Sequence, residues 1–387
     1  MPAKVVQIEA FDPLLFRDGR PFAGDPGALN ARSLPIPMPS TIAGFIRTFI
    51  GNQQGWNWKQ DWQRAMQVKV LGPLLYRTQR LEMQGEFIFP APADALVYNE
   101  NGALRVAVLV PANPPGGSGC NLPHSGLKPL KVSVDTKPAG GYNFWKWSDM
   151  EQWLLGRGQP PSEQIEGLPR ETRTHVAIDD KKGTSKEHHL FTVEYRAFEH
   201  LQRAQGDAVY YRWAMLARVE LPEDVSATLD GVGTLGGERR AGFLHETQVW
   251  LECPETIRNA LSHARKVRMV LATPAIFRDG WKPGWLNNDL QGTPPGTSVQ
   301  LKLVGAAVKR HEAVSGWDYV HNRPKSVRWL APAGSVYFFE IVDGSAERLT
   351  HEAWLQPMSD DEQDRNNGYG LALWGVWNDT DAGGNKP

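Results

Sequence analysis

Two segments of the chain share one pattern, in which apolar and polar residues alternate before a proline and a Phe-Arg-Asp-Gly turn. The first segment is residues 4–19, KVVQIEAFDPLLFRDG, and the second is residues 266–280, KVRMVLATPAIFRDG. Alternation with a period of two is typical of a strand, and Asp followed by Gly favours a chain reversal. We interpret the segments as the first strands of two related domains, residues 1–255 and residues 262–387.

A helix is predicted after the first strand. Ser40 is a favourable N-cap, and four apolar residues between positions 42 and 49 form a stripe at helical spacing that ends before Gly51. Residues 52–165 are interpreted as a long insertion, which includes a Trp-rich stretch and the loop PANPPGGSGCNLPHSG. Trp56, Trp58 and Trp62 favour packing in the core or at a subunit interface, with base stacking as the alternative.

The rest of the chain gives a similar order of elements in both domains. In the first domain, strands are predicted at 174–179, 188–198, 210–221 and 243–252, with a short helix at 222–231 and a glycine-rich loop at 231–242. In the second, strands are predicted at 300–310, 325–334, 335–342 and 371–377, with a short helix at 348–357 and a glycine-rich loop at 366–370. The order is typical of the ferredoxin-like βαββαβ fold, so we expect an α+β protein with two such modules.

The first glycine-rich loop has the sequence pattern of a dinucleotide-binding fingerprint. Gly231, Gly233 and Gly236 fit the pattern G-x-G-x-x-G. That fingerprint works when a strand enters the turn and a helix leaves it, because the N-terminus of the helix then faces the pyrophosphate. Here a predicted helix precedes the loop, a strand follows it, and no Lys-Ser or Lys-Thr pair adjoins the glycines. We therefore expect no cofactor.

Composition limits the kind of partner that the chain can attract. The formal net charge of the 387 residues is −1, so a nucleic-acid site must be a local patch or be completed by a partner protein. The sequence contains two cysteines, which suits a reducing cytosol, and its N-terminus has no signal-peptide pattern. No apolar stretch is long enough to span a bilayer. We expect a soluble cytoplasmic protein without a membrane partner.

The residues after the fingerprint point to RNA. Gly236 and Gly237 are followed by Glu238, Arg239 and Arg240. Glycines let a ribose-phosphate backbone approach main-chain N–H groups, and arginines pair with phosphates or stack on bases. The RNA-recognition motif is itself a ferredoxin-like module. The alternative is a connection whose glycines only permit tight packing.

Several stretches of the chain resemble the RAMP proteins of CRISPR systems, and in particular the third-subunit family of type III-B (Cmr) complexes. They run from residue 11 to residue 377: FDPLLFRDGRPF, PSTIAGFIRT, RTHVAID, LFTVEYRAF, TLGGERRAGF, KSVRWLAPAGSVYFFE and NNGYGLALWGVW. The resemblance implies a non-catalytic subunit that holds the 5′ tag of the CRISPR RNA (crRNA). It also implies two kinds of protein partner, the large polymerase-like subunit and the neighbouring backbone RAMP subunits, with target cleavage by the latter.

Further basic and polar residues are candidates for RNA contact. Ser40 and Thr41 open a helix whose N–H groups can hold a phosphate, with Arg47 two turns later, although Ser40 could equally be a plain N-cap. The other candidates are basic residues near predicted turns or on one strand face: Arg17, Arg20, Arg173, His175, Lys325 and Arg328. For Arg17 and Arg20 the alternative is a surface salt bridge, and for His175 it is a residue that anchors a turn.

Catalysis and metal binding have little support in the sequence. A RAMP endoribonuclease that processes the crRNA precursor is the alternative function, and it would need His175 to pair with a second general acid or base. No spacing identifies that second group, so we expect no enzyme activity and assign no catalytic residue. Cys120 and His124 lie four residues apart, but no second ligand pair completes a zinc site, so we expect no metal.

Overall fold

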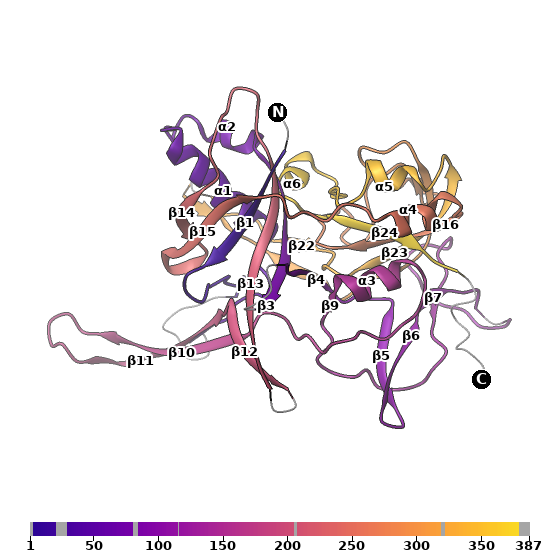
Figure 1. Ribbon diagram of the computed structural model, residues 1–387, viewed down its shortest axis with the longest axis horizontal. Helices are drawn as coiled ribbons and strands as arrows, with labels where there is room; N and C mark the ends of the chain where they lie inside the picture. The colour runs from indigo at the N-terminus through magenta and orange to yellow at the C-terminus, as the bar shows by residue number, and fades with distance from the viewer. Residues whose placement is uncertain are drawn as a thin grey trace. The chain divides into compact units, whose positions relative to one another are not determined.

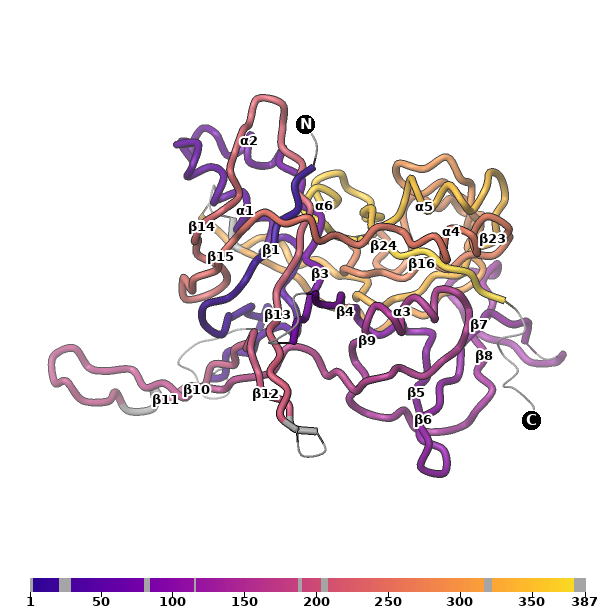
Figure 2. Tube along the Cα trace, in the orientation of Figure 1, coloured from indigo at the N-terminus to yellow at the C-terminus, as the bar shows by residue number. Residues whose placement is uncertain are grey.

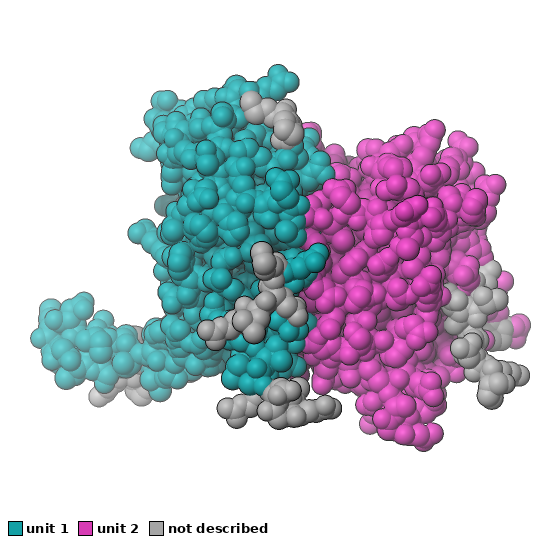
Figure 3. All heavy atoms as spheres, in the orientation of Figure 1, with its two compact units in different colours: residues 1–85, 167–249, 313–328 teal, residues 86–166, 250–312, 329–387 magenta. Residues whose placement is uncertain are grey.

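The computed structural model describes residues 3–20, 29–79, 84–114, 116–204, 207–318 and 322–378. The protein is mixed α and β, as predicted, with many strands and few helices (Figure 1). It divides into two compact units (Figure 3). The first unit contains residues 1–85, 167–249 and 313–328, and the second contains residues 86–166, 250–312 and 329–387.

The first unit contains an antiparallel sheet with the strand order β14-β15-β1-β13-β3, and β12 also pairs with β13. Within the first unit, the strands of this sheet are β1 (Lys4–Ala10), β3 (Lys69–Gln79), β12 (Glu199–Ala204), β13 (Asp207–Glu220), β14 (Gly231–Leu235) and β15 (Arg240–Thr247). The alternation in residues 4–10 places Val6 and Ile8 in the core, which confirms the predicted first strand.

Helix α1 (Pro39–Gln53) contacts β3 and β14 and buries the predicted apolar stripe, including Ile42, Phe45 and Ile46. It begins two residues earlier than predicted. Its N-cap is Met38 and Pro39 occupies its first turn, so the assignment of Ser40 as N-cap was wrong. Proline suits this position because its fixed φ matches the helix and its missing N–H would have no partner within the helix. A short helix, α2 (Trp62–Gln67), follows.

Gly44 offers a simple test of this helix. It lies in the interior of α1, is exposed, and has open space where a Cβ would be. Glycine in a helix interior costs about 0.5–1 kcal/mol relative to alanine because it loses more backbone entropy on folding. Gly44→Ala is therefore expected to raise the free energy of unfolding by about that amount in urea denaturation. A loss of stability would contradict the open environment of this position.

A long hairpin extends from the first unit in both views of the chain (Figures 1 and 2). Its strands are β10 (Arg170–Ile178) and β11 (Ser185–Arg196), and the short strand β2 (Asn30–Ala31) pairs with β11 in parallel. Both hairpin strands were predicted. The base of the hairpin is held by Leu14, which exchanges two main-chain hydrogen bonds with Arg196.

Two predictions for residues 222–242 are corrected. Residues 222–230 form no helix, because α1 binds this segment in an irregular conformation. Gln53 exchanges two hydrogen bonds with the main chain of Thr228, and the amide of Gln54 donates to Ser226 O. The glycines that follow are not a loop in their first half, because residues 231–235 are strand β14, paired with β15.

The second unit contains an antiparallel sheet with the strand order β17-β18-β23-β16-β24. Its strands are β16 (Lys266–Leu271), β17 (Gln291–Gly292), β18 (Gln300–Ala307), β23 (Val336–Asp343) and β24 (Ala372–Val376). Four of them, in the order β24-β16-β23-β18, match β15-β1-β13-β3 of the first unit. Each repeated apolar segment of the sequence thus occupies the same place in its own sheet.

The remaining helices and strands are given by their bounds. The helices are α3 (Trp147–Leu154), α4 (Glu255–Ser262), α5 (Arg348–Glu352) and α6 (Glu362–Asn366), with the 3₁₀ helix η1 (Gly237–Arg239) in the first unit. The short strands are β4 (Glu86–Pro90), β5 (Ala95–Glu100), β6 (Ala103–Val108), β7 (Val110–Pro111), β8 (Leu130–Lys131), β9 (Phe144–Lys146), β19 (Glu312–Val314), β20 (Trp317–Asp318), β21 (Arg323–Pro324) and β22 (Arg328–Leu330). The predicted strand at 325–334 thus shrinks to β22, and the predicted loop at 366–370 begins at the end of α6. None of the helices in the described ranges is long and apolar enough to cross a membrane.

The compact units do not follow the predicted boundaries. Residues 52–85 of the predicted insertion supply β3 to the first sheet, whereas residues 86–166 belong to the second unit. A buried ion pair explains the second assignment. Asp94 accepts a hydrogen bond from Arg268 on β16 at 2.7 Å, and both side chains are almost fully buried.

Candidate functional site

The glycine-rich segment has two structural parts, and its first part packs against α1. A Cβ on Gly233 would lie 2.7 Å from the Phe45 ring, and a Cβ on Gly231 would lie 3.1 Å from the Phe49 ring. Both distances are shorter than ordinary van der Waals contact. These two glycines therefore allow β14 to lie close to α1, which is the tight-packing alternative raised by the sequence.

The second part is the turn between β14 and β15, residues 236–239. Gly236 has a φ of +75°, and Glu238 and Arg239 also have positive φ values. The turn lies against the segment before the first Phe-Arg-Asp-Gly motif, because the Gly237 N–H donates to Leu15 O at 2.8 Å. That bond corrects one expectation. The main-chain N–H of Gly237 serves the fold and is not available to a phosphate.

Tyr195 on β11 connects this turn to the long hairpin. Its side chain is fully buried, and its hydroxyl donates to Glu238 Oε2 at 2.8 Å. The guanidinium carbon of Arg240 lies 4.1 Å from the centre of the Tyr195 ring, and that of Arg173 lies 5.2 Å from it. Burial, reinforced by Glu238, raises the pKa of Tyr195. The ring is therefore a neutral platform that holds two cations.

His175 completes the group. Its ring stacks on Phe191 with 5.4 Å between ring centroids, and its Nε2 lies 3.4 Å from the hydroxyl oxygen of Tyr195. Arg173 and His175 have the same partly buried position on alternate residues of β10, which confirms that they share one strand face. We call Arg173, His175, Tyr195, Glu238 and Arg240 the Tyr195 cluster.

The charges within the Tyr195 cluster largely compensate one another. Arg240 forms an ion pair with Glu238 at 3.1 Å, and Arg173 forms one with Glu171 at 2.6 Å. Burial lowers the pKa of Arg240, but its contacts with Glu238 and Tyr195 outweigh burial and raise it overall. Arg240 thus remains charged, but Glu238 neutralises much of its charge within the cluster. Arg239 is exposed in the turn, so residues 238–240 together carry a net charge of +1.

Sequence reasoning identified three members of the cluster and missed Tyr195 and Glu238. The available signal for Tyr195 was the register of the predicted hairpin, since it pairs with Glu171, two residues before Arg173. Alternation along a strand would then have placed Tyr195 on the same face as Arg173. Nothing in the sequence indicates that Glu238, 43 residues later, reaches its hydroxyl.

Arg47 is a correction. It is buried in α1, and its Nε and Nη2 donate to Val68 O at 3.0 and 2.7 Å. Burial lowers its pKa to about 10. Arg47 therefore binds the chain at the end of α2 and is not a phosphate ligand. Ser40 and Thr41 lie in the first turn of α1 and are partly exposed, where the Thr41 N–H donates to Met38 O.

The remaining predicted residues lie on exposed parts of the chain. Arg20 pairs with Asp18 at 3.4 Å, as in the salt-bridge alternative, and the Arg17 guanidinium donates to Arg20 O at 3.1 Å. Lys325 and Arg328 lie in an exposed segment, where the Lys325 N–H donates to Gly316 O. Among the described residues, no contact joins these four side chains to the Tyr195 cluster.

The structure also shows the surroundings of Cys120 and His124 in the long loop. Cys120 is exposed and unbridged. His124 Nε2 lies 2.7 Å from Asn288 O, and its Nδ1 accepts the Gly126 N–H at 2.9 Å, so both ring nitrogens serve the fold. Across the described residues, no three His, Cys, Asp or Glu side chains are grouped to hold a metal ion.

Comparison with known proteins identifies the family. Two solved structures match the chain, both described as the type III-B Cmr-beta complex bound to cognate target RNA, one of them also with AMPPnP. The chain matches them at 19% and, with AMPPnP, 17% identity, with a TM-score of 0.45 and coverage of 87% of this chain and 86% of the other in each case. No curated protein sequence matches. A sequence model of the CRISPR-associated protein family Cas_Cmr3 matches residues 6–377. The chain therefore belongs to the Cas_Cmr3 family of CRISPR-associated proteins.

Proposed function

We propose that this chain is a non-catalytic RNA-binding subunit of a cytoplasmic type III-B complex and that it holds the 5′ tag of the crRNA. The observation that carries the proposal is the turn at residues 236–239. It presents the exposed Arg239 beside Arg240 in the sequence, and Arg240 and Arg173 are both fixed over the buried ring of Tyr195. A preorganised group of arginines loses little side-chain entropy when it binds phosphates.

We further propose that both units are ferredoxin-like modules. The antiparallel order β15-β1-β13-β3 corresponds to 4-1-3-2 in chain order within the module, which is the order of a split βαβ sheet. The first unit keeps the first helix of such a module, α1, and has an irregular segment in place of the second. The second unit has α5 and α6 before its last strand and an irregular segment between β16 and β18.

The partners that follow from this proposal are the crRNA, the large polymerase-like subunit and the neighbouring backbone RAMP subunits. With a formal net charge of −1, the isolated chain has little long-range attraction for RNA. We infer that neighbouring subunits supply the rest of the positive surface and that the turn fixes the position of the tag.

One observation favours the alternative function, crRNA processing, and another argues against it. His175 and Tyr195 lie within 3.4 Å, which is the kind of acid–base pair that metal-independent RNA cleavage uses. The Tyr195 hydroxyl, however, is buried and donates a hydrogen bond to Glu238 Oε2, and its pKa is raised. Such a hydroxyl is poorly placed to exchange a proton with a ribose, which supports the binding role.

The test is RNA crosslinking in the reconstituted complex. Arg239→Ala is expected to reduce crosslinks to the 5′ tag about tenfold, since a charged phosphate contact contributes about 1.5–3 kcal/mol. It should also reduce the salt slope of binding by about 1. Arg105→Ala is the matched control, because Arg105 is an exposed arginine of the second unit that pairs with Glu100. Unchanged crosslinks in Arg239→Ala would refute the role of the turn.

A second measurement separates binding from catalysis. The purified chain is incubated with repeat-containing precursor RNA without metal, and no defined product is expected. A specific cut that disappears in His175→Ala would establish the processing alternative instead.

A further inference from the structure

Strand β14 forms one edge of the first unit's sheet, and within the described part of the chain no strand pairs with its outer side. The direction of its main-chain groups follows from a neighbouring contact. Ala241 O accepts the Phe11 N–H, so the main-chain groups of Ala241 face β1. Thr234 is opposite Ala241, and Val232 is opposite Phe243. Thr234 and Val232 therefore direct their own N–H and C=O groups outward, because these groups alternate in direction along a strand.

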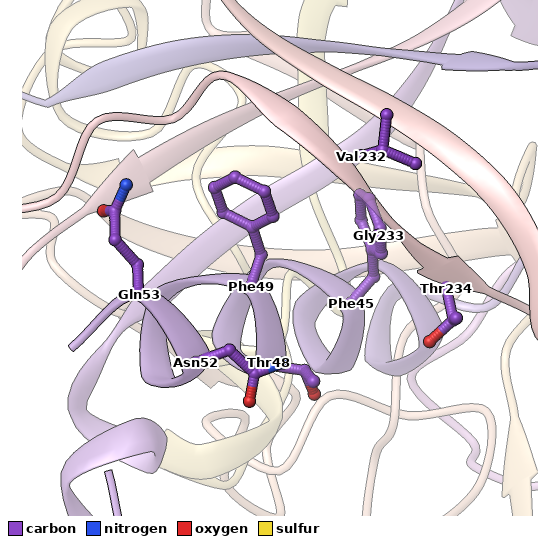
Figure 4. Close-up of a pocket in the computed structure, with 8 residues that line it drawn as sticks. All are labelled: Phe45, Thr48, Phe49, Asn52, Gln53, Val232, Gly233 and Thr234. Atoms are coloured by element: carbon purple, nitrogen blue, oxygen red, sulfur yellow. The ribbon is translucent and has the colours of Figure 1, made fainter. Parts of the chain in front are cut away.

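A groove of about 420 Å³ lies beside this edge. Its walls are α1 and β14, and its lining residues are Phe45, Thr48, Phe49, Asn52, Gln53, Val232, Gly233 and Thr234. Figure 4 shows the rings of Phe45 and Phe49 directed from the helix toward the strand. Gly231 and Gly233 place no side chain on the helix side of the strand, where the buried Leu235 is the remaining residue of β14. The groove thus has an apolar floor, a strand edge along one wall and a helix along the other.

The short edge strand β14 carries neither of two common protections against strand pairing, charge and proline. Natural edge strands carry lysine, proline or inward-pointing charges that prevent another strand from adding. The sequence of β14 is GVGTL, without charge or proline, and Val232 is 59% exposed. An exposed, uncharged edge beside a groove is the arrangement used for β-strand addition of a peptide.

We propose that this groove binds an extended, uncharged segment of a partner protein, which adds to β14 as a further strand. The argument for this occupant is charge complementarity. None of the groove's lining residues is charged, so an RNA phosphate finds no cation there and a charged peptide side chain no counterion. Alternate residues of the added strand face Phe45 and Phe49, so apolar side chains belong at those positions. The proposal depends on membership of a multi-subunit complex and not on the RNA contacts of the turn.

The test compares the isolated full-length chain with the reconstituted complex. Amide hydrogen exchange at Val232 and Thr234 is expected to be about tenfold slower in the complex, since each outward N–H gains one hydrogen bond. Photocrosslinking from p-benzoylphenylalanine at position 232 should join the chain to a partner subunit, at a segment with uncharged, alternating residues. This side chain projects from the face of the sheet and leaves the edge open.

A matched pair of variants tests the main-chain contact. Val232→Pro removes an outward N–H without removing a bond to β15, and it is expected to abolish the protection of Thr234 in the complex. Val232→Thr keeps the N–H and should behave as the parent does. Equal exchange rates of Val232 and Thr234 in the isolated chain and in the complex would overturn the proposal. Crosslinks from position 232 to RNA, to the chain's own residues or to a second copy would do the same. Crosslinks to the 5′ tag are measured in the same samples. If these crosslinks are lost while Val232 and Thr234 remain protected from exchange, the result counts against the proposed RNA contact and not against strand addition.

Discussion

Arg268→Leu is expected to lower the free energy of unfolding by about 3–5 kcal/mol, because it leaves Asp94 as an unpaired charge in the core. Arg268 makes three buried contacts. Its Nη1 binds Asp94 Oδ2 at 2.7 Å, its Nη2 donates to Trp153 O at 2.7 Å, and its Nε donates to Val376 O at 2.9 Å. Urea denaturation of the purified variant measures the loss.

Two controls distinguish this loss from a general cost of removing an arginine. Arg64 pairs with Asp224 at 2.7 Å, but both side chains are well exposed, so Arg64→Leu should cost about 1 kcal/mol or less. Replacing both members of the buried pair, as Asp94→Leu with Arg268→Met, should recover much of the stability because no charge remains unpaired. The interpretation fails if Arg268→Leu costs no more than Arg64→Leu.

The pH dependence of Arg268→Leu provides an independent check. Burial raises the pKa of Asp94, and Arg268 and Trp153 oppose that rise. Without Arg268, the folded state therefore binds a proton more readily than the unfolded chain, whose aspartate has a pKa of about 3.9. The stability deficit of the variant should be small at or below that pH and should grow as the pH rises through the raised pKa.

The elements that were predicted correctly depend on local patterns. Alternation identified β1 and β16, and the apolar stripe identified α1, because burial of one face is visible in a single segment. The absent helix at 222–230 depends on a long-range contact instead. Its main chain is bound by Gln53 and Gln54, which lie about 170 residues earlier in the chain. No pattern within a single segment indicates such a long-range contact.

The candidate site was likewise predictable only where a local pattern determines it. The common face of Arg173 and His175 follows from strand alternation, and the structure confirms it. Arg47 was misassigned because helical spacing shows which residues form the apolar stripe but not what covers the neighbouring positions, here Val68 and α2. The assignment of residues 86–166 depends on partners such as Arg268, which no segment-by-segment reading reveals.

Gly236→Ala is expected to lower the free energy of unfolding by about 2–4 kcal/mol. Gly236 combines a φ of +75° with a ψ of −160°, a conformation that is almost restricted to glycine. An added Cβ would also lie 2.6 Å from Leu15 O, a main-chain atom that cannot move without shifting its neighbours. Gly19→Ala is the matched control, since Gly19 has no positive φ and open space around it. Its stability should change little.

The same substitution tests whether the turn acts as one structural unit. Displacement of Gly236 moves Arg240 away from Tyr195 and shifts the exposed Arg239 with the turn, so crosslinks to the 5′ tag should fall together with stability. Arg239→Ala removes an exposed side chain, so it should reduce the crosslinks while leaving the urea midpoint unchanged. If Gly236→Ala lost stability but kept full crosslinking, the 5′ tag would have to be held elsewhere, because the arginines could no longer occupy the positions that the turn gives them.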